Sequence, residues 1–147
     1  MRADKPNYYL NIAEAVLERS TCIRRHFGSV LTNEDIIIST GYNGSMRGDS
    51  NCCDNNSCIR NEMNCASGEG YEYCIAIHAE QNAIINVSRR NALGGTLFLV
   101  GIDVDTGNYF PIEPCYVCMK LIKVIGIRKI FIRETKEKYK IIELPEI

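Results

Sequence analysis

Apolar and polar residues alternate along the chain in a way that predicts helices and strands in turn. Between residues 6 and 20, apolar side chains recur at helical spacing, which predicts an amphipathic first helix. The apolar runs at 30–31 and 36–38 flank three polar residues, 33–35, and this pattern is typical of two strands joined by a tight turn. The first third of the chain is therefore expected to form a helix and then a β-hairpin that ends at Gly41.

The second half of the chain continues the alternation of helices and strands. Apolar residues on one side of residues 78–90 predict a helix, and its closing arginines suit a helix C-terminus. An apolar run at 96–102, a helical segment at 115–125 and another apolar run at 127–132 follow, and a last strand is expected around 141–144. A strand, a helix and a strand in so few residues imply a parallel pair with a right-handed crossover. The expected fold is thus a mixed sheet with helices on its faces.

Residues 44–73 interrupt this pattern. They show almost no apolar periodicity and are rich in Asn, Gly, Ser and Cys. A compact domain rarely contains so long a loop without support. Something other than a hydrophobic core is therefore expected to order this insert.

Length and charge narrow the classes of protein that fit. The 147 residues predict one domain over 1–147, and the formal net charge of −1 counts against a polybasic nucleic-acid partner. The N-terminus has no signal-peptide core, and no window of eighteen apolar residues occurs. These features predict a cytoplasmic protein with no membrane partner.

The eight cysteines are the unusual part of the composition. Disulfides rarely persist in a reducing compartment, where close cysteine spacing indicates metal binding or catalysis instead. Five cysteines lie between residues 52 and 74, whereas Cys115 and Cys118 form a separate C-x-x-C. The two groups suggest two sites.

The starts of two predicted helices carry the chemistry. His78-Ala79-Glu80 opens one helix and Pro114-Cys115-x-x-Cys118 opens the other. One imidazole and two thiolates can hold a zinc ion and leave its fourth tetrahedral position open, as a catalytic site requires. Zinc would acidify a water molecule from a pKa of about 15.7 toward about 7, and the carboxylate of Glu80 could shuttle its proton to a leaving group.

Each of these features alone has a simpler explanation. A lone histidine is more often structural, a lone C-x-x-C is as often a redox or zinc-knuckle motif, and an acidic residue at a helix start favours the helix dipole. Together, H-x-E and P-C-x-x-C form the signature of zinc-dependent nucleobase deaminases.

The sequence resembles the deoxycytidylate (dCMP) deaminase family over roughly residues 8–133. The resemblance rests on the segments 20–24, 28–30 and 41–44 (Ser-Thr-Cys-Ile-Arg, Gly-Ser-Val and Gly-Tyr-Asn-Gly) and on the two zinc motifs. It implies a cytidine-deaminase-like three-layer α/β/α sandwich around a mixed sheet of five or four strands. The implied single catalytic domain contains a cysteine-rich insert at about residues 45–77.

The resemblance also implies an activity: hydrolysis of dCMP to dUMP and ammonia, which feeds thymidylate synthesis. His78, Cys115 and Cys118 would hold the catalytic zinc, and Glu80 would move protons. Members of the family commonly form homo-oligomers, such as hexamers, dimers or trimers, and many respond to dCTP and dTTP as effectors.

Four further residues are candidates for substrate contact. The resemblance places the backbone near Ala79 at the pyrimidine carbonyl and Asn43 at the deoxyribose, although Asn-Gly also occurs in turns for geometric reasons alone. Arg24 and Arg25 are candidates for the phosphate, because guanidinium groups bind it bidentately. Arg24 is preferred for its place in the family-like entry segment, and both arginines could equally be solvated.

The insert suggests a second, structural zinc site with four sulfur ligands. The expected ligands are Cys22, Cys53, Cys58 and Cys74. Cys52 and Cys65 are taken as non-ligands, although little in the sequence separates them from Cys53 and Cys58. Free thiols in a flexible loop are the alternative.

Other functions share some of these features. The substrate could be dCTP, cytidine or another pyrimidine, and an editing deaminase acting on tRNA would carry the same zinc motifs. A non-catalytic zinc-bound interaction module would use the cysteines as a scaffold and would not need Glu80.

Overall fold

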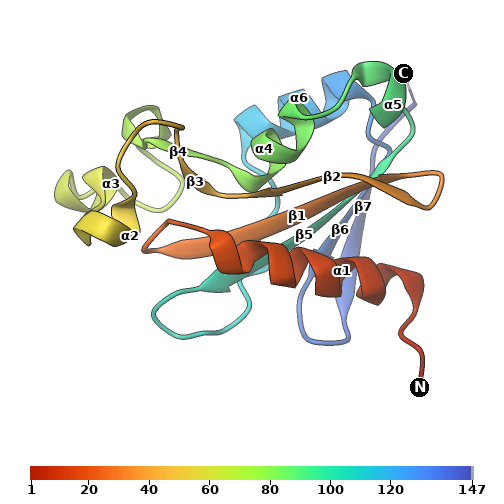
Figure 1. Ribbon diagram of the computed structural model, residues 1–147, viewed down its shortest axis with the longest axis horizontal. Coiled ribbons are helices and arrows are strands. Elements are labelled where there is room, and N and C mark those ends of the chain that lie inside the picture. The colour runs from red at the N-terminus through yellow and green to blue at the C-terminus, as the bar shows by residue number, and fades with distance from the viewer. Residues whose placement is uncertain (147) are drawn as a thin grey trace.

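The computed structural model describes residues 1–146, and a mixed five-stranded sheet lies at its centre (Figure 1). Neighbouring strands follow the order β2-β1-β5-β6-β7. Their bounds are Ile36–Tyr42, Arg25–Asn33, Thr96–Asp103, Lys129–Arg133 and Tyr139–Glu143 in that order. The pair β5 and β6 is parallel, and the other three pairs are antiparallel. The five-stranded form of the expected mixed sheet, with its last strand, is confirmed.

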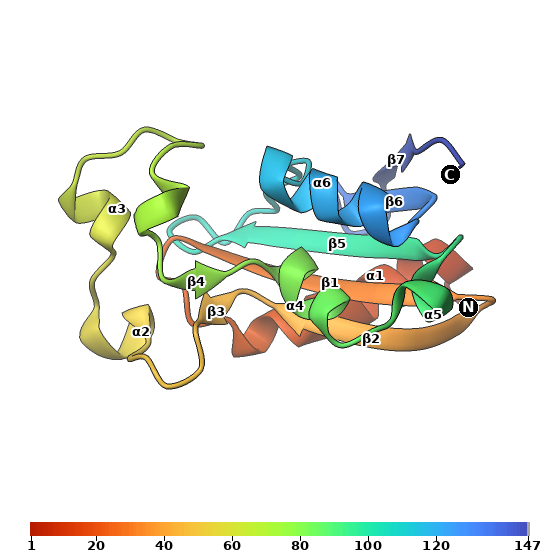
Figure 2. The same cartoon turned by 90° about the horizontal axis from the view of Figure 1, so that it is seen from above.

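Helices cover both faces of this sheet. Helix α1 (Lys5–Val16) packs on β1 and β5 from one side, whereas α4 (Ala79–Ile85) and α6 (Tyr116–Ile125) lie side by side on the other (Figures 1 and 2). Helix α6 makes the crossover between the parallel strands β5 and β6. The result is the three-layer α/β/α sandwich expected from the sequence.

Apolar residues of the central strands point alternately to the two faces. Val30, Phe98 and Phe131 form one row across β1, β5 and β6 and pack against α1, while Leu99 and Ile132 point to the α4 and α6 side. Because both faces are covered, these strands carry continuous apolar runs rather than an alternating pattern. The sheet is thereby fixed between two hydrophobic cores.

The first helix begins and ends with recognisable signals. The side chain of Asp4 accepts a hydrogen bond from the backbone N–H of Asn7 (2.8 Å), and Pro6 stands in the first turn. The helix continues as a 3-10 turn, Leu17–Arg19, so the expected span of 6–20 was nearly right. In the part of the chain that the structure describes, no helix combines the length and apolar character needed to cross a bilayer.

The helix expected over residues 78–90 is divided in two, which corrects the prediction. Helix α4 ends at Ile85, and a separate short helix, α5 (Arg89–Ala92), follows. The Ser88 side chain accepts a hydrogen bond from the N–H of Asn91 (3.2 Å), and this N-cap starts the new helix. Arg89 donates from Nε to the carbonyl of Val124 near the end of α6 (3.0 Å), so it satisfies a carbonyl at the C-terminus of α6 and not at the C-terminus of α4.

The insert projects beyond one end of the main sheet (Figures 1 and 2). It contains a two-stranded sheet and three short helical elements, which have the bounds Gly44–Ser45 (β3), Ala76–Ile77 (β4), Cys52–Asn55 (α2), Ile59–Glu62 (α3) and Tyr71–Tyr73 (η2). From residue 46 to residue 77, Cys58 and Arg60 are the buried side chains. As expected, hydrophobic packing contributes little to this region.

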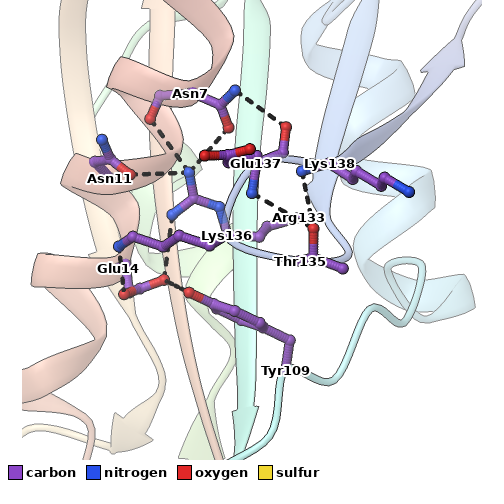
Figure 3. A network of polar contacts seen from close by, with 9 residues as sticks. All are labelled: Asn7, Asn11, Glu14, Tyr109, Arg133, Thr135, Lys136, Glu137 and Lys138. Atoms are coloured by element: carbon purple, nitrogen blue, oxygen red, sulfur yellow. Dashed lines mark hydrogen bonds and ion pairs between the residues drawn. The ribbon is translucent and has the colours of Figure 1, made fainter. Parts of the chain in front are cut away.

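A buried network of charges joins α1, β6 and the segment after β5 (Figure 3). Arg133 is fully buried and donates to Oε1 of Glu14 (3.2 Å) and to the side chains of Asn11 and Asn7 (2.9 and 3.1 Å). The hydroxyl of Tyr109 donates to the same Oε1 (2.6 Å). The network therefore anchors the segment between β5 and α6 to the first helix.

The expected hairpin is present, and its turn has an unusual backbone. Glu34 and Asp35 join β1 to β2 with φ values of 51° and 63°, in the left-handed region. Two such residues in succession are characteristic of the type I′ hairpin turn. The Tyr9 hydroxyl donates to the carbonyl of Asp35 (3.0 Å) and ties the turn to α1.

Candidate active site

Three metal-binding side chains meet where α4 and α6 begin. His78 is the N-cap of α4, Cys115 is the N-cap of α6, and Cys118 lies in the first turn of α6. Nδ1 of His78 is 3.2 Å from Sγ of Cys118 and 3.6 Å from Sγ of Cys115. Within residues 1–146, this is the one group of three or more His, Cys, Asp or Glu ligand atoms that all lie within 4.8 Å of one another.

Close contact with the sheet positions α4. The Cβ of any larger residue at Gly41 would lie 2.3 Å from the carbonyl oxygen of Ala79, so β2 touches the helix directly. The Ser29 hydroxyl donates to that carbonyl (2.9 Å), and Ser39 donates to the carbonyl of Ala83 (2.7 Å). At the helix start, the Gln81 side chain accepts from the N–H of His78 (2.8 Å). These contacts fix the first turn, which carries the chemistry.

The donor set fits a zinc ion. Burial, together with the nearby Glu80 and Cys115, raises the pKa of the Cys118 thiol, and burial lowers the pKa of His78, with the charge of Arg60 lowering it further. The imidazole is thus neutral, the form that binds metal, while thiolates at this place need a cation to offset their charge. Two sulfurs and one nitrogen give the three-ligand set of a catalytic zinc site.

Glu80 lies beside these ligands and is almost completely buried. Burial raises the pKa of its carboxyl group, and this outweighs the stabilising contacts from the backbone and the Cys118 side chain. A carboxyl group whose pKa is raised in this way can accept and return a proton near neutral pH.

A cavity of about 330 Å³ opens above these residues. His78, Glu80 and Cys115 contribute to its wall, together with side chains from four other regions: the start of β1, the segment after β2, the insert and the segment after β5. Among the contributing residues are Arg24, Phe27, Asn43, Arg60, Tyr71 and Phe110. The volume is suitable for one small organic ligand.

The expected substrate contacts all lie at this cavity, though Asn43 is already engaged. Its Oδ1 accepts from the Phe27 N–H (2.8 Å) and the Ser20 hydroxyl (2.5 Å), and its Nδ2 donates to the Arg25 carbonyl (2.9 Å). One N–H of the amide is left over. Ala79, wholly buried, also contributes to the wall.

The two neighbouring arginines differ in their partners. Arg24 lines the cavity, and its Nη1 is buried without a hydrogen-bond partner among the described residues. Arg25 stacks on Phe110, with Cζ 4.4 Å from the ring centre, and pairs with Asp103 at 3.3 Å. Arg24 is therefore the arginine of the two that lacks a counter-ion.

The cysteines of the insert differ in burial and in surroundings. Burial raises the pKa of Cys52, and the neighbouring thiols Cys22, Cys58 and Cys74 raise it further. Cys53 instead is exposed, and its sulfur lies 3.9 Å from its neighbour Asp54. Within residues 1–146 no three of these sulfurs all lie within 4.8 Å of one another, so the ligand set Cys22, Cys53, Cys58 and Cys74 stays a prediction.

The sequence analysis missed the contribution of the insert to the cavity. Arg60 is buried, and its guanidinium carbon lies 4.3 Å from the ring centre of Tyr71, whose edge packs against His78 at 5.2 Å between ring centres. A single arginine in a segment without periodicity carries no sequence signal that marks it as buried.

An α/β/α fold with a His-Cys-Cys group and a buried glutamate at two adjacent helix starts defines the class of zinc-dependent nucleobase deaminases. The chain belongs to the family described as "Cytidine and deoxycytidylate deaminase zinc-binding region", which its residues 3–134 match.

Known proteins of this family are similar over most of the chain. The deoxycytidylate deaminase of Mycobacterium phage D29 is 33% identical over 134 residues, which cover 88% of this chain and 94% of the phage protein. That of Schizosaccharomyces pombe is 31% identical over 84% of this chain, which spans only 35% of the yeast protein. The apo crystal structure of dCMP deaminase from cyanophage S-TIM5 has a TM-score of 0.60 at 25% identity, covering 88% of this chain and 82% of that one.

Proposed function

We propose that this protein hydrolyses dCMP to dUMP and ammonia as a zinc-dependent deaminase in which residues 1–147 form one catalytic domain. The observation that carries the proposal is the meeting of His78, Cys115 and Cys118 beside the buried Glu80 at a cavity of nucleotide size. The deoxycytidylate deaminases of phage D29 and fission yeast support this choice of substrate by their similarity.

The side chains divide the work of the reaction. His78, Cys115 and Cys118 hold zinc, which supplies the Lewis acidity that makes water a nucleophile near neutral pH. Glu80 takes one proton from the attacking water and gives it to ring N3, and it then moves the proton of the added hydroxyl to the amino group, which leaves as ammonia while C4 becomes a carbonyl. Burial of Glu80 keeps this proton from exchanging with bulk solvent during the transfer.

Three cavity residues orient the nucleotide. The backbone N–H near Ala79 donates to the pyrimidine carbonyl, and the remaining amide N–H of Asn43 donates to the deoxyribose. Arg24 binds the phosphate, because its guanidinium belongs to a residue of the cavity wall and has no carboxylate partner in the described part of the chain. Asn43 also holds the start of β1, so it positions the pocket as well as the sugar.

The cysteine-rich insert of residues 45–77 holds a second, structural zinc. Cys22, Cys58 and Cys74 are the proposed ligands, with Cys52 in place of Cys53 because Cys52 is half-buried whereas Cys53 is exposed. The N–H of Cys53 donates to the carbonyl of Thr21 (3.0 Å), which brings α2 against the Cys22 segment. We expect purified protein to contain two zinc ions, Cys52→Ser to retain one, and Cys53→Ser to retain both; loss of zinc from Cys53→Ser would contradict this ligand set.

The protein works as a homo-oligomer, for which the outer surface of α6 is the proposed contact. Val117, Leu121 and Val124 recur at helical spacing and are exposed, next to exposed Ile85 of α4. Sedimentation velocity should show dimers, trimers or hexamers, and Val124→Glu should shift them toward monomer. A wild-type monomer would contradict this proposal.

Two further properties follow from the family resemblance. The effectors dCTP and dTTP should raise and lower the activity respectively, which initial rates at fixed dCMP will measure. The protein acts in the cytoplasm, which fractionation of producing cells will test.

A substrate panel tests the activity itself. Zinc-loaded protein is incubated with dCMP, dCTP, cytidine, deoxycytidine and tRNA, and deamination is followed by ultraviolet absorbance and by ammonia release. We expect dCMP to have the highest kcat/KM. A preference for dCTP or cytidine would contradict the proposed substrate, and a preference for tRNA would favour an editing deaminase.

The variant Glu80→Gln separates an enzyme from a zinc-bound scaffold. It should keep its zinc and its fold but lose about 100-fold or more of turnover, because the proton carrier is gone. Glu18→Gln, on an exposed residue that does not contribute to the cavity wall, is the matched control. Full activity in Glu80→Gln would refute the mechanism.

A further inference from the structure

Arg60 of the insert is a buried charge without a counter-ion. Only 8% of its surface is exposed, and no carboxylate within residues 1–146 forms an ion pair with it. Burial of an unpaired charge is costly unless a partner of opposite charge is supplied. Arg133, by contrast, is a buried arginine whose guanidinium forms an ion pair with the carboxylate of Glu14.

Backbone and ring contacts hold the guanidinium of Arg60 in place but leave some of its N–H donors without an acceptor. Nε donates to the carbonyl of Glu69 (2.8 Å), Nη2 reaches the carbonyl of Ala66 (3.5 Å), and the group stacks on Tyr71. Nη1 has no partner in the described part of the chain, yet it is not among the atoms sealed from solvent. Arginine has five N–H donors, so the face toward the cavity retains free ones.

The cavity wall therefore carries two guanidinium groups that lack an anion, Arg60 and Arg24. Arg25 does not join them, since Asp103 neutralises it. A phosphate monoester near neutral pH carries about two negative charges and three acceptor oxygens, which two guanidinium groups can satisfy together.

The spacing along the wall suits a nucleotide. The ring of Tyr71 contacts both the guanidinium of Arg60, whose Cζ is 4.3 Å from the ring centre, and the imidazole of His78, at 5.2 Å between ring centres. In a nucleoside monophosphate only the sugar lies between the base and the phosphate. A base that reacts beside His78 thus has its phosphate within reach of the insert.

We propose that Arg60 binds the 5′-phosphate of the substrate together with Arg24, which makes the cysteine-rich insert a determinant of specificity for nucleoside monophosphates. This inference rests on the proposed function, since it concerns the substrate of the same site. It also gives the insert a task beyond its own stability, because the loop that holds Arg60 forms part of the substrate cavity.

The test compares substrates with and without the phosphate. In Arg60→Gln, kcat/KM for dCMP should fall by about 10- to 100-fold through a higher KM, because a charge-assisted contact is lost. The kcat/KM for deoxycytidine should stay within about twofold of the wild-type value. Where the wild type turns over deoxycytidine too slowly, inhibition by dUMP and by deoxyuridine provides the same comparison.

Controls separate the roles that Arg60 could have. Arg60→Lys keeps the charge and should recover part of the lost affinity, and Arg19→Gln, on an exposed arginine, should behave as wild type. Zinc content and melting temperature report whether the insert has kept its structure. Equal losses for both substrates, or unchanged dCMP kinetics, would overturn the assignment of Arg60 to the phosphate. A wild-type protein that deaminates no cytosine compound would instead overturn the proposed function.

Discussion

Gly41 is the point where β2 meets the catalytic helix, and replacing it with alanine tests how that helix is positioned. The added Cβ would lie 2.3 Å from the Ala79 carbonyl oxygen and 2.5 Å from the Ala83 nitrogen, both backbone atoms of α4. Neither atom can rotate away. The helix must therefore move from the sheet as a body, taking His78 and Glu80 with it.

The size of this movement can be bounded from the contact distance. Cβ atoms do not approach other heavy atoms more closely than 3.0 Å, so α4 must retreat by at least about 0.7 Å. Overpacking of this kind costs about 1–3 kcal/mol of stability. A displacement of about 1 Å at a catalytic group lowers activity by about 100-fold. We expect Gly41→Ala to lose about 10- to 100-fold in kcat/KM.

Gly28 provides a matched control on the other face of the sheet. A Cβ there would lie 2.1 Å from the Ala13 carbonyl oxygen and 2.7 Å from the Leu17 nitrogen, so Gly28→Ala displaces α1 rather than α4. The two variants should lose similar stability by urea unfolding, whereas kcat/KM per zinc-loaded molecule should fall mainly in Gly41→Ala. Full activity in Gly41→Ala, or an equal loss in both, would refute the reasoning.

Three other predictions concern the network, the pocket and the metal. Burial alone would raise the pKa of Glu14, but hydrogen bonds from Tyr109 and Arg133 and the charge of Lys136 outweigh it and leave the pKa below its ordinary value. Its carboxylate therefore stabilises the fold fully above about pH 4.3, and this stabilisation is lost as the pH falls through the lowered pKa. When urea unfolding is measured between about pH 3 and 7, the free energy of unfolding should depend less on pH in Glu14→Gln than in the wild type. Asn43→Ala should lower the melting temperature and raise KM for dCMP, because three hydrogen bonds are lost, and an unchanged KM would count against its contact with the sugar. A strong zinc chelator should abolish deamination and lower the melting temperature, and added zinc should restore both. Activity that survives when no zinc is detectable would contradict the mechanism.

The sequence was sufficient to predict the framework and the meeting of His78, Cys115 and Cys118, because both depend on local patterns. Apolar runs such as Thr96 to Ile102 mark buried strands wherever they occur, and the order of strand and helix then restricts the sheet to few arrangements. His78, Cys115 and Cys118 meet because each stands at a helix start and the two helices lie on one face of the sheet.

The features that the sequence analysis missed depend on contacts between distant residues. The break after Ile85 requires Ser88 to cap a new helix, a local signal that the longer apolar pattern obscured. Cys53 is exposed whereas Cys52 is half-buried, a difference that depends on which way a four-residue helix turns, and adjacent cysteines look alike in sequence. Arg60 is buried by carbonyl groups of its own loop, and polar contacts of this kind have no periodicity.

The turn between β1 and β2 offers a route to a more durable catalyst. Its left-handed backbone at Glu34 and Asp35 is one that side chains with a Cβ disfavour, while Asn-Gly adopts it readily. The nine residues of β1 put this turn roughly 30 Å from the end of the strand that borders the cavity. Heat tolerance can therefore be engineered at the turn without altering the chemistry at the opposite end.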